Sequence, residues 1–217
     1  MSGGARGERV AMVTGATGAV GLAVIDRLRA EGFAVAGVDH EGGSGDLPLA
    51  VDTTDRAQMI SAAERATAEL GSLSVLVTAP HHHDAAPFGE MDPDRWSRLL
   101  STHLGATVNA CAAVVPAMVR AGRGTVVTTS SWLALAGVPG ECYQAAATGT
   151  ILAFTKSFAL EVASKGVRVN CVAVGPLEAP PEPHIRAADV AETVSFLINN
   201  GEFFVGQVFC PAAGAVV

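Results

Sequence analysis

Basic residues, cysteines and long apolar runs are all scarce in this sequence of 217 residues. With 14 Lys and Arg against 21 Asp and Glu, its formal net charge is -7. Nucleic-acid binding requires a basic face, so we expect no nucleic-acid partner. No apolar run reaches the roughly 18 residues of a membrane-spanning helix, and residues 1–8, which we expect to be flexible, hold no hydrophobic segment of a signal peptide. The sequence therefore predicts a cytoplasmic protein without a membrane segment.

The small number of cysteines excludes two further classes of protein. The sequence has four: Cys111, Cys142, Cys171 and Cys210. They lie far apart and form no Cys-x-x-Cys pair, so we expect free thiols in a reducing compartment rather than a disulfide framework or a zinc site. The triplet His81-His82-His83 has no acidic or cysteine partner at a recognised spacing. Adjacent side chains also point in different directions, so we predict no metal there.

Short strand-like runs alternate with longer helical patterns along the chain. The runs at 10–14, 34–38, 73–78, 124–129 and 167–172 are rich in β-branched residues, as expected of strands buried on both faces. Helices are predicted over 19–30, 92–119, 141–164 and 188–199. Asp92 and Pro93 provide an N-cap and a first helical residue, and Pro116 should kink the last turns of that helix. The pattern predicts an α/β fold, in which residues 9–217 form one Rossmann-like domain with a doubly wound parallel sheet and helices on both faces.

A glycine-rich turn, Thr14-Gly-Ala-Thr-Gly-Ala-Val-Gly21, follows the first predicted strand and opens a helix. Its glycines would let the backbone approach a pyrophosphate, whose charge is met by the helix N-terminus. Asp39 stands at the end of the second strand, where a carboxylate binds adenosine ribose hydroxyls. No arginine follows it to accept a 2'-phosphate, so a bound cofactor should be NAD(H) rather than NADP(H). The alternative is that the turn only joins strand to helix.

The segment Tyr143-Gln-Ala-Ala-Ala147, continued through Thr148 to Glu161, resembles the active-site helix of the short-chain dehydrogenase/reductase family, whose signature is Tyr-x-x-x-Lys. The resemblance extends from Arg9 to Gly214. It implies that Tyr143 is the catalytic acid, while Ala147 replaces the lysine that holds the nicotinamide ribose. Without that lysine the phenol should stay neutral at pH 7, so reduction is the favoured direction.

The same resemblance implies further catalytic positions. Ser130 lies 13 residues before Tyr143, whereas alignment through Gly137 selects Ser131 as the serine that polarises the substrate carbonyl. We prefer Ser131. His103 stands seven residues after Trp96, where the family has a relay asparagine, and is either a substitute relay or a hydrogen-bonded structural residue. The histidine triplet is either a solvated loop or a source of one imidazole near the tyrosine.

The resemblance also implies cofactor contacts, and it shows where this chain departs from the family. The expected contacts are Gly15, Thr17, Gly18, Gly21, Asp39, Asp52 and Thr53. Ala19 replaces a family glycine, so the remaining glycines match the pattern of the family's extended branch. Thr78-Ala79-Pro80-His81 replaces the Asn-Asn-Ala-Gly that shapes the floor beneath the nicotinamide ribose. The substrate lid is shortened to about residues 176–187, which should leave the site open.

Three functions fit these observations, because fold alone does not select among them. The first is an NAD(H)-dependent reductase of a small carbonyl compound, such as a polyketide-like one. The second is a catalytically silent subunit that pairs with an active homologue through the helices beginning near Asp92 and Glu141, which resemble the family's oligomerisation helices. The third is a redox-free cyclase or dehydratase using Tyr143, Ser131 and His103. All three imply a small-molecule site and a homo- or hetero-oligomer.

Overall fold

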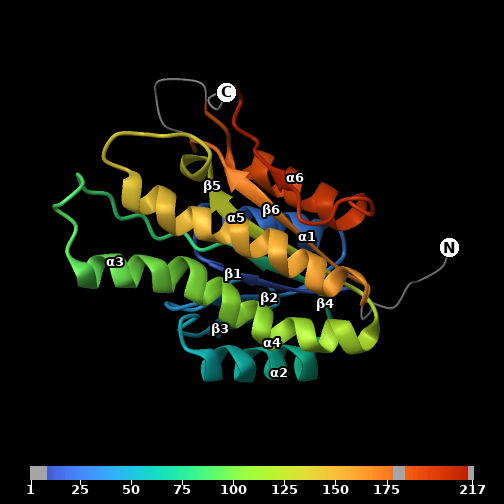
Figure 1. Cartoon of the computed structure of the whole chain (residues 1–217). Helices are drawn as coiled ribbons and strands as arrows, with labels where there is room; N and C mark the ends of the chain where they lie inside the picture. The colour runs from blue at the N-terminus through green and yellow to red at the C-terminus, as the bar shows by residue number, and fades with distance from the viewer. Residues whose placement is uncertain (1–8, 178–183, 215–217) are drawn as a thin grey trace.

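The computed structural model describes residues 9–177 and 184–214, which fold around one parallel sheet of seven strands (Figure 1). The strands lie in the order β3-β2-β1-β4-β5-β6-β7. Their bounds are β1 Val10–Thr14, β2 Ala34–Asp39, β3 Leu47–Ala50, β4 Leu73–Thr78, β5 Gly124–Ser131, β6 Val167–Val174 and β7 Val208–Phe209. The predicted Rossmann-like α/β fold is confirmed. The expected flexible segment 1–8 lies outside the described residues.

Helices cover both faces of this sheet. They are α1 Ala19–Ala30, α2 Arg56–Leu70, α3 Pro93–Leu100, α4 Ala106–Ala121, α5 Cys142–Ala163 and α6 Ala187–Asn199. Successive residues of a strand point to opposite faces, so β1 contributes to two cores. Met12 packs into the core beneath α2, α4 and α5, and Val13 packs into the core beneath α1 and α6. Both side chains are fully buried.

Five strands form where the sequence predicted them, and two further strands form at the edges of the sheet. β3 is short and contains Pro48, which is tolerated there because an edge strand has one side free of ladder hydrogen bonds. β7 has only two residues. Neither strand presents the β-branched run of a buried strand, which is why the sequence pattern did not reveal them.

The helix predicted from Asp92 forms, but it contains an unexpected π-helical turn. The Asp92 carboxylate accepts a hydrogen bond from the backbone N–H of Arg95 at 2.9 Å, as an N-cap does. A π-turn at Ser101–Gly105 joins α3 to α4. α4 continues through Pro116 to Ala121 and ends at Gly122 in the left-handed conformation.

This continuous helix, Pro93–Ala121, is long and apolar enough to cross a membrane by length and composition alone. Its 29 residues include polar interruptions, so no single apolar run in the sequence revealed it. In the fold α4 buries Ala110, Val114 and Met118 in the core beneath the sheet. A core helix of a globular domain meets the same length and composition criteria.

Candidate active site

Two cavities open at the carboxyl ends of the strands, the edge at which open α/β sheets bind ligands. The larger, of about 660 Å³, is lined by the ends of β5 and β6, the first turns of α5 and the loop after β4. The smaller, of about 330 Å³, is lined by the glycine-rich turn, residues after β2 and β3, and the same loop. Residues 80–83 of the loop line both cavities.

The glycine-rich turn packs so closely that two of its glycines have no alternative. Gly15 has a φ of 70°, and a Cβ there would lie 1.9 Å from the Ala79 carbonyl oxygen. A Cβ on Gly21 would lie 2.0 Å from the Gly15 carbonyl oxygen. These contacts fix α1 against β1 and β4, and they leave the N-terminus of α1 facing the cavities.

Asp39 is held in place by the glycine-rich turn. Its Oδ2 accepts hydrogen bonds from the Thr17 backbone N–H at 2.9 Å and from the Thr17 hydroxyl at 2.6 Å. Burial alone would raise the pKa of Asp39, but these bonds and one from the His40 N–H outweigh it, so the pKa lies below its ordinary value. The carboxylate is therefore charged at neutral pH. Asp39, Asp52 and Thr53 all line the smaller cavity.

The two candidate serines end β5, and both line the larger cavity. The Ser130 hydroxyl is buried and donates to the Thr148 carbonyl oxygen at 2.8 Å. The Ser131 hydroxyl oxygen instead accepts a hydrogen bond from the Leu133 N–H at 3.2 Å. Ser131 can therefore still offer its proton to a carbonyl oxygen, which makes it the stronger candidate for polarising a substrate.

Tyr143 lies where the loop after β4 meets α3, and it is not part of the lining of either cavity. Its ring stacks on Phe88, with centroids 6.1 Å apart, and packs against Trp96 at 5.7 Å. Its hydroxyl oxygen accepts a hydrogen bond from the Gly89 N–H at 3.4 Å. The structure therefore differs from the expectation that the phenol faces the substrate.

The residues of this helix that line the larger cavity are Gln144 and, one turn later, Thr148. Successive helical residues are rotated by about 100°, so the inward position moves from Tyr143 to its neighbour. Gln144 stands 13 residues after Ser131, the same interval that separates Ser130 from Tyr143. The sequence contained this signal, since alignment to Ser131 already required one residue to be missing before the helix.

His103 and Gln144 together hold the loop after β4. His103 Nε2 lies 2.7 Å from the His82 carbonyl oxygen, to which Gln144 Nε2 also donates at 3.4 Å. The Asp84 N–H donates to Gln144 Oε1. Burial lowers the pKa of His103, which keeps the imidazole neutral with its proton on Nε2. This geometry fits the structural alternative for His103 better than a proton relay.

The histidine triplet lines both cavities and is solvent-exposed. His83 Nε2 lies 3.1 Å from the carboxylate of Glu141 at the N-terminus of α5. Within residues 9–177 and 184–214, His, Cys, Asp and Glu side chains form no group of three that could hold a metal. The triplet therefore contributes imidazole groups to the cavities.

The shortened lid is described only at its two ends. Gly175, Pro176 and Leu177 line the larger cavity, and Leu177 forms a parallel bridge with Ile185. The intervening residues 178–183 lie outside the described part of the chain.

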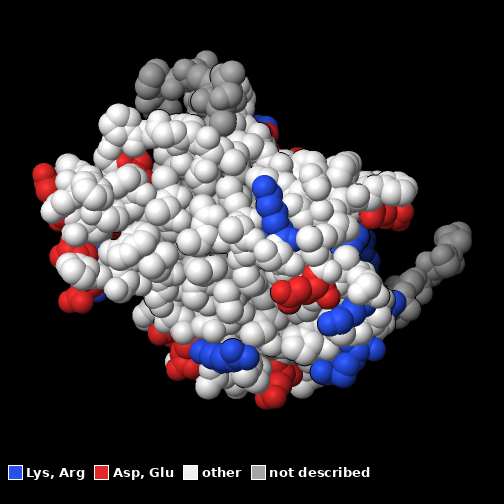
Figure 2. Space-filling model, viewed as in Figure 1, with Lys and Arg blue, Asp and Glu red and all other residues white. Residues whose placement is uncertain are grey.

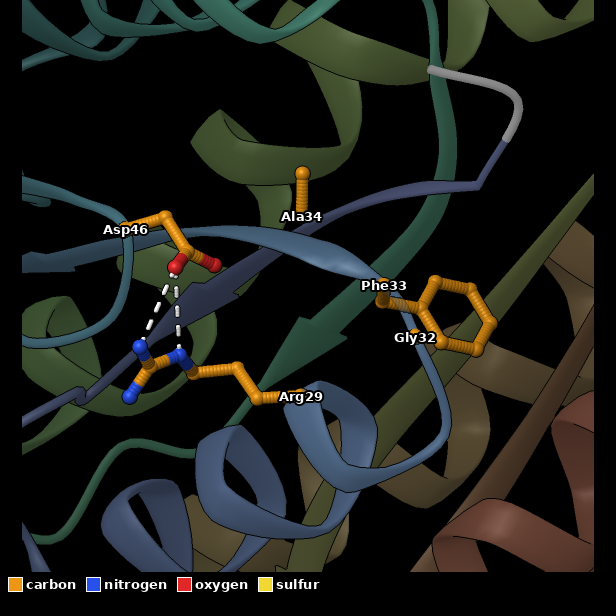
Figure 3. A pocket seen from close by; sticks show the side chains of 5 residues that line it. All are labelled: Arg29, Gly32, Phe33, Ala34 and Asp46. Atoms are coloured by element: carbon orange, nitrogen blue, oxygen red, sulfur yellow. Dashed lines mark hydrogen bonds and ion pairs between the residues drawn. The ribbon is translucent and has the colours of Figure 1, made fainter. Parts of the chain in front are cut away.

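A further depression of about 370 Å³ lies beside the α1–β2 turn (Figure 3). Arg29 reaches Asp46 there at 3.2 Å, and the other carboxylate oxygen of Asp46 accepts from the Val35 N–H at 3.0 Å. Phe33 borders the depression, and its ring carries the guanidinium of Arg9 4.0 Å above it. These contacts tie α1 and the start of β3 to β2, so we assign the depression a structural role.

Comparison with known proteins gives one consistent result. The model of the family described as short chain dehydrogenase matches residues 9–189. The chain is 32% identical to the 3-oxoacyl-[acyl-carrier-protein] reductase FabG of Escherichia coli, over 78% of this chain and 74% of the relative. It is also 32% identical to the cis-4-hydroxycyclohexanecarboxylate dehydrogenase of Sinomonas cyclohexanicum, over 95% of this chain and 96% of the relative.

Solved structures agree on the fold. A variant of a Serratia marcescens short-chain dehydrogenase/reductase superposes with a TM-score of 0.85 at 22% identity, covering 95% of this chain and 96% of the other. A ribose-5-phosphate isomerase from Brucella melitensis superposes with a TM-score of 0.87 at 25% identity, covering 95% and 91%.

Proposed function

Because this chain belongs to the short-chain dehydrogenase family, an oxidoreductase family, we propose that it is a catalytically silent member that pairs with an active homologue. The proposal rests on one observation: Gln144 and Thr148 line the cavity where the family's tyrosine and lysine would act. Tyr143 is turned toward Phe88 and Trp96 instead.

A carbonyl reductase must deliver a proton as hydride reaches the carbonyl carbon. The amide of Gln144 is not an acid at neutral pH, and it is already engaged with the loop after β4. Thr148 carries no positive charge, and its hydroxyl donates to the Gln144 carbonyl oxygen at 2.8 Å. His103 is neutral and directs its Nε2 proton at the His82 carbonyl. These three contacts support a cavity that has lost the family's proton donor.

The face formed by α4 and α5 supports the partner. Figure 1 shows these helices side by side in front of the sheet, and Figure 2 shows that this face carries few charged side chains. Between the two helices runs a groove of about 520 Å³, lined mainly by apolar residues that include Val115 and Phe158. Leu160 of α5 is 75% exposed beside it. We propose that the corresponding helices of a family member with an intact Tyr-x-x-x-Lys pack into this groove.

The remaining parts of the proposal concern ligand and compartment. A small carbonyl compound held by Ser131 would fit the larger cavity, and the charged Asp39 favours NAD(H)-type over NADP(H)-type nucleotides. Cys111, Cys142, Cys171 and Cys210 are free thiols. Burial raises the pKa of Cys111 and of Cys171 to about 12, so both thiols stay protonated and unreactive. A reducing cytoplasm suits such a chain.

The test compares the chain alone, an intact homologue from the same source alone, and the two expressed together. Oxidation of NADH would be followed with a 3-oxoacyl thioester and a cyclic ketoacid, chosen from the relatives' names. We expect no turnover by the chain alone, and co-purification with the homologue. Turnover by a strict homo-oligomer of this chain would contradict the proposal.

A second candidate is the NAD(H)-dependent reductase itself, favoured by the retained pair of Asp39 at the smaller cavity and Ser131 at the larger one. It requires Tyr143 to turn inward when substrate binds. In the same assay, turnover by the chain alone that disappears in Tyr143→Phe would establish it. Turnover that persists after removal of all nicotinamide cofactor would instead favour redox-free chemistry, for which the His83–Glu141 pair could move protons.

A further inference from the structure

The ring of His81 lies directly on Gly18 in the glycine-rich turn. A Cβ on Gly18 would meet Cγ of His81 at 2.7 Å and Nδ1 at 2.8 Å. Gly18 has a φ of -72° and a ψ of 156°, a backbone conformation that any residue adopts. Backbone geometry therefore does not require glycine here. The missing side chain makes room for the imidazole.

His81 also belongs to the linings of both cavities, so its ring stands where one passes into the other. The smaller cavity contains Asp39, which suits an adenosine ribose, and the larger contains Ser131. A dinucleotide spanning both would lay its pyrophosphate across the glycine-rich turn at the N-terminus of α1. Gly18 is the N-cap of that helix. The imidazole of His81 therefore fills the space that the pyrophosphate needs.

The backbone that carries His81 is fixed on both sides. The Ala79 N–H donates to the Thr14 carbonyl oxygen at 3.1 Å, which continues the β1–β4 ladder. The His82 carbonyl is held by His103 and Gln144. A bound pyrophosphate can consequently be accommodated only by rotating the His81 side chain out of its place, because moving the loop would break these bonds.

From these contacts we infer that His81 determines which nucleotide the site accepts. The smaller cavity binds an adenine nucleoside, and the imidazole bars the pyrophosphate of a dinucleotide from the passage over Gly18. This inference goes beyond the proposed function, since it concerns binding and holds whether or not the chain transfers hydride.

Calorimetric titration of the full chain with adenosine, ADP-ribose and NADH tests the inference. We expect His81→Ala to strengthen binding of ADP-ribose and of NADH by about tenfold, while adenosine affinity changes by less than about twofold. His82→Ala is the matched control, since its side chain lines the same cavities while its backbone carbonyl stays available to His103 and Gln144. It should change none of the three affinities.

Three outcomes would overturn the inference. Weaker or unchanged NADH binding in His81→Ala would show that the imidazole assists the pyrophosphate or is indifferent to it. Tighter binding of NADH than of adenosine by the unmodified chain would show that no barrier exists. Failure of adenosine to bind any variant at millimolar concentration would remove the nucleoside site. None of these outcomes depends on turnover, so they are separable from failure of the silent-subunit proposal.

The contact between His81 and Gly18 can be tested without any ligand. Gly18→Ala should lower the melting temperature of the unmodified chain, because its Cβ meets the imidazole. In the His81→Ala background the same substitution should be nearly neutral. Equal effects in both backgrounds would show that the imidazole does not occupy this position in solution.

Discussion

Gln144 and Ser131 line the same cavity and stand 13 residues apart, while Tyr143 packs between Phe88 and Trp96. The family's active-site spacing is therefore kept, but an amide occupies the position of the phenol. Thr148 occupies the position of the lysine one turn later. The predictions below follow from this arrangement and from the contacts around it.

Replacing both residues should restore reductase chemistry. We expect Gln144→Tyr with Thr148→Lys, in the His81→Ala background that admits cofactor, to oxidise NADH with a 3-oxoacyl thioester roughly 10²-fold faster than the His81→Ala chain, since a placed general acid contributes about that much. Absorbance at the NADH band measures the rate. Either single substitution serves as a control and should give little activity. A double variant that binds NADH but stays inactive would show that more than this pair has been lost.

Tyr143 should matter for stability more than for ligand binding. Tyr143→Ala removes the stacking on Phe88 and Trp96, so we expect a loss of roughly 1–2 kcal/mol in the free energy of unfolding, measured by urea denaturation. Tyr143→Phe keeps the rings and loses only the long bond from Gly89, so it should stay within about 0.5 kcal/mol. A large effect of the phenylalanine variant on adenosine binding would place the hydroxyl in the site after all.

His103 should make stability fall as the pH falls. Burial lowers its pKa in the folded chain from an ordinary 6.5, so below pH 6.5 the unfolded chain binds a proton that the folded chain does not. The free energy of unfolding then decreases toward acid until the pH passes the lowered folded value. His103→Gln can still donate to the His82 carbonyl but does not titrate. Urea denaturation from pH 7 to 5 should give a shallower slope for this variant, and equal slopes would contradict the prediction.

Asp39 should exclude a 2'-phosphate. Its carboxylate stays charged at neutral pH because hydrogen bonds from Thr17 and His40 lower its pKa despite burial. We expect the unmodified chain to bind adenosine more tightly than adenosine 2'-monophosphate. Asp39→Asn should weaken adenosine binding by roughly tenfold and reduce this discrimination, since a charge-assisted bond contributes about 1.5–3 kcal/mol. Discrimination that is unaltered in a calorimetric titration would assign the preference to another residue.

Association should depend on the groove between α4 and α5. Leu160→Asp introduces a charge beside it, at a side chain that is 75% exposed, so folding should be unaffected. We expect complex formation with the homologue, followed by light scattering, to weaken at least about tenfold. Ile60→Asp on α2 is the matched control, since Ile60 is also an exposed helical apolar residue. Equal effects of both substitutions would place the interface elsewhere.

The sequence predicted the fold better than the site, for physical reasons that differ. Strong local signals such as the Asp92 cap and the β-branched run before Thr78 located helices and strands within a few residues. The site depends on which side of a helix faces inward, and one residue of misalignment turns a side chain by about 100°. Tyr143 was therefore placed in the cavity when its neighbour Gln144 lies there. Sequence spacing also gave no sign that His81 would rest on Gly18, because 63 residues separate them.

The order of strands in the sheet determines when during synthesis this chain can fold. The central strand β1 pairs on one side with β4, so Val10 waits for Leu73, and β4 in turn pairs with β5 much later in the chain. Closing such long loops costs entropy before the contacts compensate for it, which places the domain among slow folders. Until β5 and β6 emerge from the ribosome, the apolar edge of β4 is open to aggregation. Yield at low temperature or with chaperones should consequently exceed yield under rapid expression.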